Sequence, residues 1–428
     1  MADISVSTPA VVRPYRENLR QALDANAFFH YFWASTYSTA GRALHATVIG
    51  YIVYDLSHSG FLLGLVAFMQ MVPQLLLAPI VGVVVDRVDR RRILMLESAT
   101  QVVSLLILGL LALTGNLSVP AIAAIVVVVG IASAFDYPAR SALLPMVVPI
   151  HTLLSANAFY SLAGNIARIG VPLLAGVLID SAGVGIVLLL GAAIYVPAST
   201  LAAAIPLSTE VLATTAAHTR HALAPGARSS ARRDMGDAIT YIRATPLLRA
   251  SLVNDIAPYL FGMSYLALLP AITSDTLDGG ARMLGLLFGL VGAGALLGTL
   301  VATGMSGHQR RGRTIWVTML GTGAGILLIA YGDSLLIIAA GLLVTGIFQT
   351  IYVIQNDTLI QTFAEERFRG RALAVQSMIN GLMPFGLLLA GVLAELWSTS
   401  IALAVTGGAM VLSALHTALF RPDMRNLR

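Results

Sequence analysis

The chain has 428 residues, of which 57% are hydrophobic and 11% are charged, and its formal net charge is +5. Soluble domains carry about 25% charged residues, so this composition excludes a soluble fold: too few polar groups remain to cover the surface. The absence of cysteine excludes disulfides, thiolate metal sites and cysteine nucleophiles, and we expect no metal and no cofactor.

Apolar blocks of about 20 residues follow one another along the chain, each long enough to cross a bilayer core of roughly 30 Å. Backbone polar groups have no water partner there, so each block should be a helix. Residues 1–25 are polar and lack a signal-peptide core, so the first block is expected to be an uncleaved anchor. The twelve predicted spans are 27–54, 61–84, 93–114, 118–138, 155–178, 184–206, 250–272, 283–305, 314–332, 335–357, 372–394 and 399–420.

The arginines predict the orientation of these spans. Almost all loop arginines fall on the side of the two chain ends, and the opposite side has only Arg282. By the positive-inside rule, both termini and the arginine-rich loops are expected to be cytoplasmic, in a bacterial inner membrane. Because the arginines lie in short loops between apolar blocks, they indicate contact with a lipid bilayer and not with nucleic acid.

The longest polar stretch lies in the middle of the chain and divides six spans from six. We therefore expect an N-terminal six-helix bundle over 1–206, a cytoplasmic central loop over 207–249 and a C-terminal six-helix bundle over 250–428. Apolar offsets of three and four over Arg233–Leu248 predict an amphipathic helix on the membrane surface. The hexamer Leu173–Leu178 recurs unchanged as Leu388–Leu393, in the fifth and eleventh spans, as expected for two related halves.

The loop after the second span reads Gly-Val-Val-Val-Asp-Arg-Val-Asp-Arg-Arg-Arg over residues 82–92. It resembles the Gly-x-x-x-Asp-Arg-x-Gly-Arg-Arg signature of the major facilitator superfamily, with Asp89 in place of the second glycine. That resemblance implies a twelve-helix transporter fold in which this loop locks the cytoplasmic side shut. The residues it implies for the conformational gate are Gly82, Asp86, Arg87, Arg90 and Arg91. The alternative is a plain cluster of topology-setting arginines.

Three further segments extend the resemblance to the drug and siderophore exporter branch of the superfamily, the enterobactin-exporter-like proteins. They are Gln70–Pro73, Phe135–Arg140 and Arg369–Arg371. Asp136 and Arg140 are four apart and are predicted to pair within the gate. The matching loop of the second half, Gly304–Arg311, has no aspartate, which predicts a degenerate second gate.

Residues 164–176 of the fifth span loosely resemble the antiporter motif of drug–proton exchangers, although Val171 separates Gly170 from Pro172. Helix packing through a Gly/Pro kink explains the same residues equally well. In the eighth span, Gly285 and Gly289, then Gly294 and Gly298, form small-residue pairs that predict packing surfaces.

Polar stripes inside the apolar blocks predict a central substrate cavity, because buried polar groups in a bilayer need a partner or water. Hydrogen bonding that merely holds the bundle together is the alternative for each Asn, Gln or Ser. The predicted cavity residues are His30, Trp33, Arg42, His45, Gln70, Gln74, Asn165, Arg168, Gln349, Tyr352, Asn356, Gln376 and Asn380.

A proton-coupling carboxylate must sit where water and substrate reach it alternately. We expect Asp255, which lies inside the seventh span, to have this role. The alternatives are Glu97, Asp136, Asp357, a histidine, or no proton coupling.

These observations predict a monomeric secondary transporter that works by alternating access. The resemblance implies a proton-coupled exporter of small amphiphilic molecules, either drug-like compounds or siderophores. An importer or lipid flippase of the same fold is the close alternative, and a membrane scaffold is the distant one. Because no HExxH, GxSxG or paired aspartates occur within the blocks, the sequence does not indicate an enzyme.

Overall fold

The computed structural model describes residues 26–148, 152–206, 240–305 and 311–420, and these residues form helices with no strand. Residues 233–239 of the predicted surface helix and residues 306–310 lie outside this part of the chain; residues 240–244 are helical. The elements are α2 (Asn26–Ser57), α3 (Gly60–Arg87), α4 (Arg90–Leu113), α5 (Val119–Ser133), α6 (Asp136–Val147), α7 (Leu153–Ala182), α8 (Val184–Ala203), α11 (Pro246–Ala257), η2 (Pro258–Gly262), α12 (Tyr265–Ala271), η3 (Ile272–Thr276), α13 (Ala281–Gly304), α14 (Arg311–Tyr331), α15 (Leu335–Phe363), α16 (Glu366–Asn380), α17 (Met383–Leu396) and α18 (Thr399–Phe420).

Eleven helical segments within the described ranges are long and apolar enough to cross a membrane. Helix α2 supplies the twelfth span: its 32 residues reach about 48 Å at 1.5 Å per residue. Arg42 and His45 lower its hydropathy, and α2 packs lengthwise against α7 and α8 inside the bundle. The predicted all-helical, twelve-span fold is confirmed.

Three spans are interrupted, which the apolar pattern did not predict. The fourth breaks at Ala134 and Phe135, between α5 and α6, and the eleventh breaks between α16 and α17. The seventh contains two π-helical segments, η2 and η3. Pro258 starts η2 and Pro384 lies in the first turn of α17, where the missing N–H of proline is tolerated.

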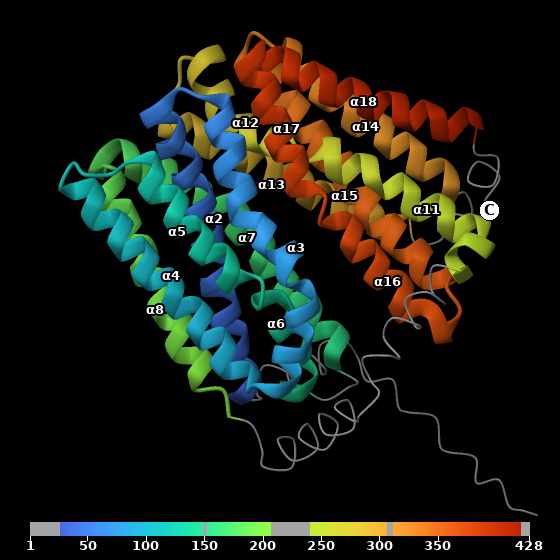
Figure 1. Cartoon of the computed structure of the whole chain (residues 1–428), viewed down its shortest axis with the longest axis horizontal. Helices are drawn as coiled ribbons and strands as arrows, with labels where there is room; N and C mark the ends of the chain where they lie inside the picture. The colour runs from blue at the N-terminus through green and yellow to red at the C-terminus, as the bar shows by residue number, and fades with distance from the viewer. Residues whose placement is uncertain (1–25, 149–151, 207–239, 306–310, 421–428) are drawn as a thin grey trace, which may run out of the picture.

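The helices form two bundles, α2–α8 and α11–α18, which meet along two seams (Figure 1). One seam is α7 against α13, and the other is α3 against α17. The recurring hexamer lies in both seams, because Gly176 belongs to α7 and Gly391 to α17. The repeat therefore marks equivalent contact points of two pseudo-symmetric halves.

The two seams match residue by residue. A Cβ placed on Gly176 would collide with the carbonyl oxygen of Ala281, and one placed on Gly391 would collide with that of Gly60. Only glycine permits such close approach of two helix backbones. The contact at Gly176 supports helix packing, and not an antiporter motif alone, as the explanation of residues 164–176. Gly285 packs in the same seam against Pro172.

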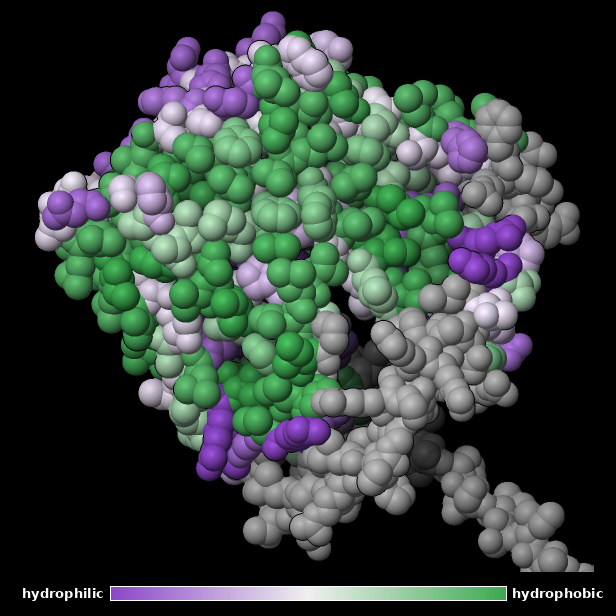
Figure 2. Space-filling view, in the orientation of Figure 1, coloured by the Kyte–Doolittle hydropathy of each residue, from purple (hydrophilic) through white to green (hydrophobic). Residues whose placement is uncertain are grey.

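The halves diverge toward one end. We call the end with Arg87–Arg92, Arg243 and Arg371 the arginine-rich end and the other the arginine-poor end. The contacts of α3 with the eleventh span run from Gly60, against α17 at the arginine-poor end, to Leu75, against Gly381 between α16 and α17. In Figure 1 the bundles separate toward the lower right, and Figure 2 shows an apolar belt with polar ends and a hollow between the halves.

Candidate functional site

A cavity of about 350 Å³ lies between the two halves, within the usual size range for small-molecule sites. Its wall comes from α2, α3, α4, α5, α12, α13 and α17, so both bundles contribute. Four predicted cavity residues line it: Arg42, His45, Gln70 and Gln74. The other lining residues are Ala46, Ile49, Gly50, Val53, Leu63, Val66, Ala67, Met71, Gln101, Ser133, Leu266, Ala267, Pro270, Phe288, Met383 and Leu387.

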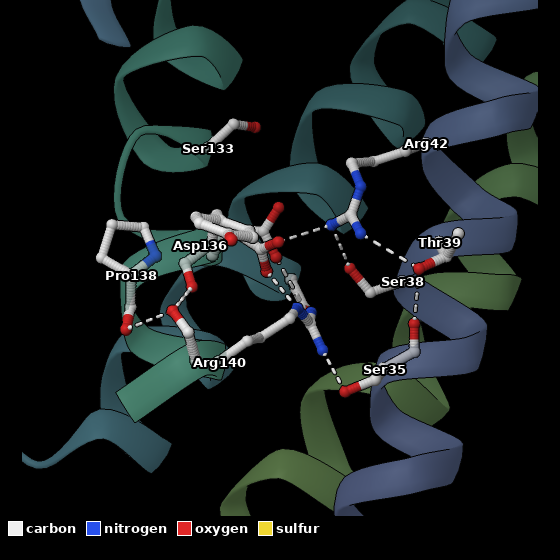
Figure 3. Close-up of polar contacts among 12 residues, drawn as sticks. Ser35, Ser38, Thr39, Arg42, Ser133, Asp136, Pro138 and Arg140 are labelled. Atoms are coloured by element: carbon white, nitrogen blue, oxygen red, sulfur yellow. Dashed lines mark hydrogen bonds and ion pairs between the residues drawn. The ribbon is translucent and has the colours of Figure 1, made fainter. Parts of the chain in front are cut away.

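Arg42, in the cavity wall, belongs to an ion-pair network that continues behind the wall (Figure 3). Arg42 Nη1 lies 2.8 Å from Asp136 Oδ2, and Arg140 Nε lies 2.7 Å from Asp136 Oδ1. Arg140 also donates to Ser35 Oγ at 2.6 Å. A single carboxylate thus joins two guanidinium groups, and both Asp136 and Arg140 are buried. The predicted Asp136–Arg140 pair forms, and of the three charged side chains only Arg42 lines the cavity.

Local structure explains the position of this network. Asp136 begins α6 directly after the break in the fourth span, so its carboxylate sits in the first turn, where the helix dipole favours negative charge. On α2, the positions of Ser38, Thr39 and Arg42 bring both hydroxyls onto the guanidinium, at 2.9 and 3.1 Å. The helix break is therefore what directs Asp136 toward Arg42, 94 residues earlier.

Glu97 and Gln101 extend the network on α4. Gln101 Nε2 donates to Glu97 Oε1 at 3.3 Å and to Ser133 Oγ at 3.4 Å. Glu97 is 2% exposed, and no arginine lies within ion-pair distance among the described contacts. Gln101 was not predicted; its spacing of four from Glu97 on one helix face was the available signal.

The polar residues predicted in the second half form a separate cluster where α11, α15 and α16 meet. Tyr352 donates to Asp255 Oδ1 at 2.8 Å, and Gln376 donates to Asp357 Oδ1 at 2.7 Å. Asn356 accepts from Ser251 on α11. Asp255 is 1% exposed, and its Oδ2 has no hydrogen-bond partner.

The remaining predicted residues lie around these two groups. Gln349 donates to the carbonyl of Gly262 in η2, and the buried Asn380 Oδ1 has no partner. His30 contacts the carbonyl of Asn26, and Trp33 packs in a row of aromatic rings on α2. Asn165 and Arg168 lie on α7, away from the cavity wall, and the Arg168 side chain is exposed.

The predicted gate loop makes polar contacts with its own half. Asp86 and Arg90 approach to 4.0 Å, and Arg91 Nη1 donates to the carbonyl of Ile205 at 2.9 Å. Arg87 is exposed. A Cβ placed on Gly82 would meet nothing within 4 Å, so this glycine faces open space.

Asp89, which replaces the glycine of the family signature, caps α4. Its carboxylate accepts from the backbone N–H of Arg91 at 3.0 Å and pairs with the Arg91 guanidinium at 2.6 Å. Its φ of −57° needs no glycine. Burial raises the pKa of Asp89, but the hydrogen bonds from Arg91 outweigh it and hold the pKa below its usual range.

Asp89→Ala should therefore lower the free energy of unfolding by about 1 kcal/mol, the usual worth of an N-cap. Because the folded-state pKa is depressed, the contribution is present above the ordinary aspartate pKa near 3.9 and is lost as the pH falls through the folded value. Thermal unfolding of the purified protein at pH 7 and at pH 3 measures both effects. A shift of the same size at both pH values would contradict this role.

Polar contacts join the halves at the arginine-poor end. Tyr54 on α2 donates to Asp275 in η3, and Ser59 Oγ donates to Glu395 at 2.7 Å. Arg282 lies 3.8 Å from Asp180. These contacts and the glycine seams hold the two halves together at that end.

Comparison with known proteins agrees with this architecture. The family described as transmembrane secretion effector matches residues 21–426. The chain belongs to this family of major facilitator transporters. It is 24% identical to the staphyloferrin A transporter of Staphylococcus aureus, covering 86% of this chain and 89% of that protein. It is 28% identical to the multidrug efflux pump Tap of Mycolicibacterium fortuitum, covering 91% and 94%.

The fold of this major facilitator transporter also matches solved structures. A bacterial homologue of the iron transporter ferroportin, in an inward-facing state, superimposes with a TM-score of 0.70. The match covers 94% of this chain and 98% of the other, at 15% identity, and so shows a shared fold. The protein is thus a multi-pass membrane transporter, and its cavity lies where such transporters bind cargo, between the two halves.

Proposed function

We propose that this transporter exports small amphiphilic molecules, drug-like compounds or siderophores, across a bacterial inner membrane by alternating access. One observation carries the proposal: both halves share a cavity and contact each other at the arginine-poor end, while they diverge at the arginine-rich end. By the positive-inside rule the arginine-rich end, with both termini, is cytoplasmic, so this conformation is open to the cytoplasm.

The position of Gly82 supports the proposed gate. In the cytoplasm-open state nothing lies near this glycine, although glycine on a membrane helix usually permits close packing. We infer that the opposite state brings the other half onto Gly82 and the Asp86–Arg91 loop. The gate residues would then act on the conformational cycle and not on cargo binding.

We assign the energy source to the proton gradient, with Asp255 as the coupling group and the monomer as the working unit. Asp255 is buried, and Tyr352 occupies only one of its carboxyl oxygens. One proton moving through 100 mV supplies about 2.3 kcal/mol, equivalent to roughly a 50-fold concentration ratio of cargo. We infer export from the efflux function in the name of the Mycolicibacterium fortuitum relative, since the name of the staphyloferrin A transporter fits transport in either direction.

Transport into everted vesicles tests this proposal. Vesicles with the protein should accumulate an amphiphilic efflux dye when a proton gradient is imposed, and a protonophore should abolish accumulation. Asp255→Asn should reduce gradient-driven accumulation at least about tenfold, since one elementary proton charge is removed from the cycle. Exchange of labelled for unlabelled dye without a gradient should persist in this variant.

Asp333→Asn, at an exposed position on the other side of the bundle, is the matched control and should transport normally. Accumulation that survives the protonophore would reject proton coupling. Full activity of Asp255→Asn would move the coupling site to Glu97, Asp136 or Asp357. Uptake only in right-side-out vesicles would favour the importer alternative.

A further inference from the structure

The cavity wall contains one formally charged side chain, Arg42, among the described lining residues. This guanidinium is 33% exposed and makes three hydrogen bonds, two from Nη1 and one from Nη2. A guanidinium has five N–H donors in a rigid fork, so Nε–H and one Nη2–H remain without a described partner. Those two donors match the two oxygens of a planar anion.

The local charge also favours an anion. Asp136 is shared between Arg42 and Arg140, so the three groups together carry one surplus positive charge. Glu97 lies close enough to interact with all three, but its hydrogen bonds come from neutral groups, Ser98 and Gln101. The network therefore sums to +1 when Glu97 is protonated and to zero when it is ionised.

His45 provides a second polar point in the same cavity. It lies three residues after Arg42 on α2, so the two Cβ atoms are about 5–6 Å apart along one helix face. The imidazole is 2% exposed, and neither ring nitrogen has a hydrogen-bond partner. An unpaired buried polar group is costly, and a ligand that bonds to it recovers that cost.

The rest of the cavity fits an apolar body. Ile49, Val53, Phe288 and Leu387 line it, together with Leu63 and Leu266. We propose that the cavity binds amphiphiles that carry a single anionic group, held by the free edge of Arg42, with a hydrogen-bonding group at His45 and an apolar body among these side chains. This inference rests on the proposed function and specifies its cargo class.

Binding to the purified full-length protein in nanodiscs tests the inference without any gradient. The probes are 4-(1-naphthyl)butyrate, its neutral amide and its trimethylammonium analogue, titrated by calorimetry against empty nanodiscs as the blank. The carboxylate should bind at least about tenfold more tightly than the amide, as a charge-assisted contact predicts. The ammonium analogue should bind more weakly than the amide.

Substitutions assign the preference to named residues. Arg42→Gln should bring the Kd of the carboxylate to that of the amide and leave the amide unchanged, which also shows that the variant is folded. Glu97→Gln should tighten carboxylate binding, because it removes a nearby negative charge. Arg249→Gln, at an exposed arginine of α11, is the control and should change nothing.

Three results would each overturn the inference. They are equal affinities for the carboxylate and the amide, a preference for the ammonium analogue, and a carboxylate preference that survives Arg42→Gln. None of these results bears on whether vesicles accumulate cargo along a gradient. Conversely, anion-selective binding without gradient-driven transport would reject the proposed function and leave the site intact.

Discussion

Asp136→Asn should destabilise the folded protein by about 3–5 kcal/mol, the cost of leaving a buried charge without its partner. The reason is the shared carboxylate: Asp136 neutralises Arg42 at 2.8 Å and Arg140 at 2.7 Å. Asparagine keeps the shape and one carbonyl oxygen but removes the negative charge, and Arg140 stays buried at 4% exposure. Thermal unfolding of the purified protein measures the loss.

A second substitution separates charge from shape. Asp136→Asn combined with Arg140→Gln should recover a large part of the stability, because the buried cation is removed with its partner. Arg42 is a third exposed and can be stabilised by water from the cavity. If Asp136→Asn lowers stability no more than Asp333→Asn does, the ion pair is not the source of the stability.

Gly64→Leu should shift the transporter toward a conformation that opens at the arginine-poor end. A Cβ on Gly64 would lie 2.7 Å from the carbonyl oxygen of Leu387 and 3.0 Å from the Cα of Gly391. Both atoms belong to the backbone of α17, so no side-chain rotation relieves the clash, and packed helices separate instead. The closed seam is then lost, while the arginine-rich end is free to close.

The absence of native cysteine makes this shift measurable. Ala46→Cys places a thiol in the cavity wall, and a membrane-impermeant maleimide applied from the arginine-poor side reports opening. Labelling should be several-fold faster with Gly64→Leu. Gly82→Leu is the matched comparison: it meets no neighbour in the present conformation and should slow the same labelling by hindering closure at the arginine-rich end. The reverse order of rates would contradict both assignments.

The sequence was sufficient for the fold because membrane spans depend on local composition. Apolar length and loop arginines placed twelve helices, and the repeated hexamer located the seams. The sequence did not predict which side chains of different helices contact one another. Arg42 and Asp136 are 94 residues apart, and nothing in the sequence around either residue shows that they pair. The break at Ala134 that turns Asp136 inward has no apolar signature, because alanine and phenylalanine also fit an unbroken helix.

The site was predicted in part for the same reason. A polar residue in an apolar span either faces a water-filled cavity or forms a hydrogen bond with another helix. The sequence does not tell which of these two applies. Arg42, His45, Gln70 and Gln74 line the cavity, whereas Tyr352, Gln376 and Asn356 bond within the second half. The spacing of four between Glu97 and Gln101 is visible in the sequence, but the contact of Gln101 with Ser133 is visible only once α4 and α5 are placed.

The residue-by-residue match of the two seams has a consequence for how such a molecule can be assembled. In the first half, α7 packs against α13 of the second half. In the second half, the counterpart of α7 is α17, and it packs against α3, the counterpart of α13, in the first half. That reciprocity is the contact pattern of a two-fold homodimer. A single six-helix polypeptide with both surfaces would pair with its own copy through the same glycines. Expressing residues 1–206 and 250–428 as separate polypeptides should accordingly yield two fragments that recombine in the membrane, without the covalent link between them.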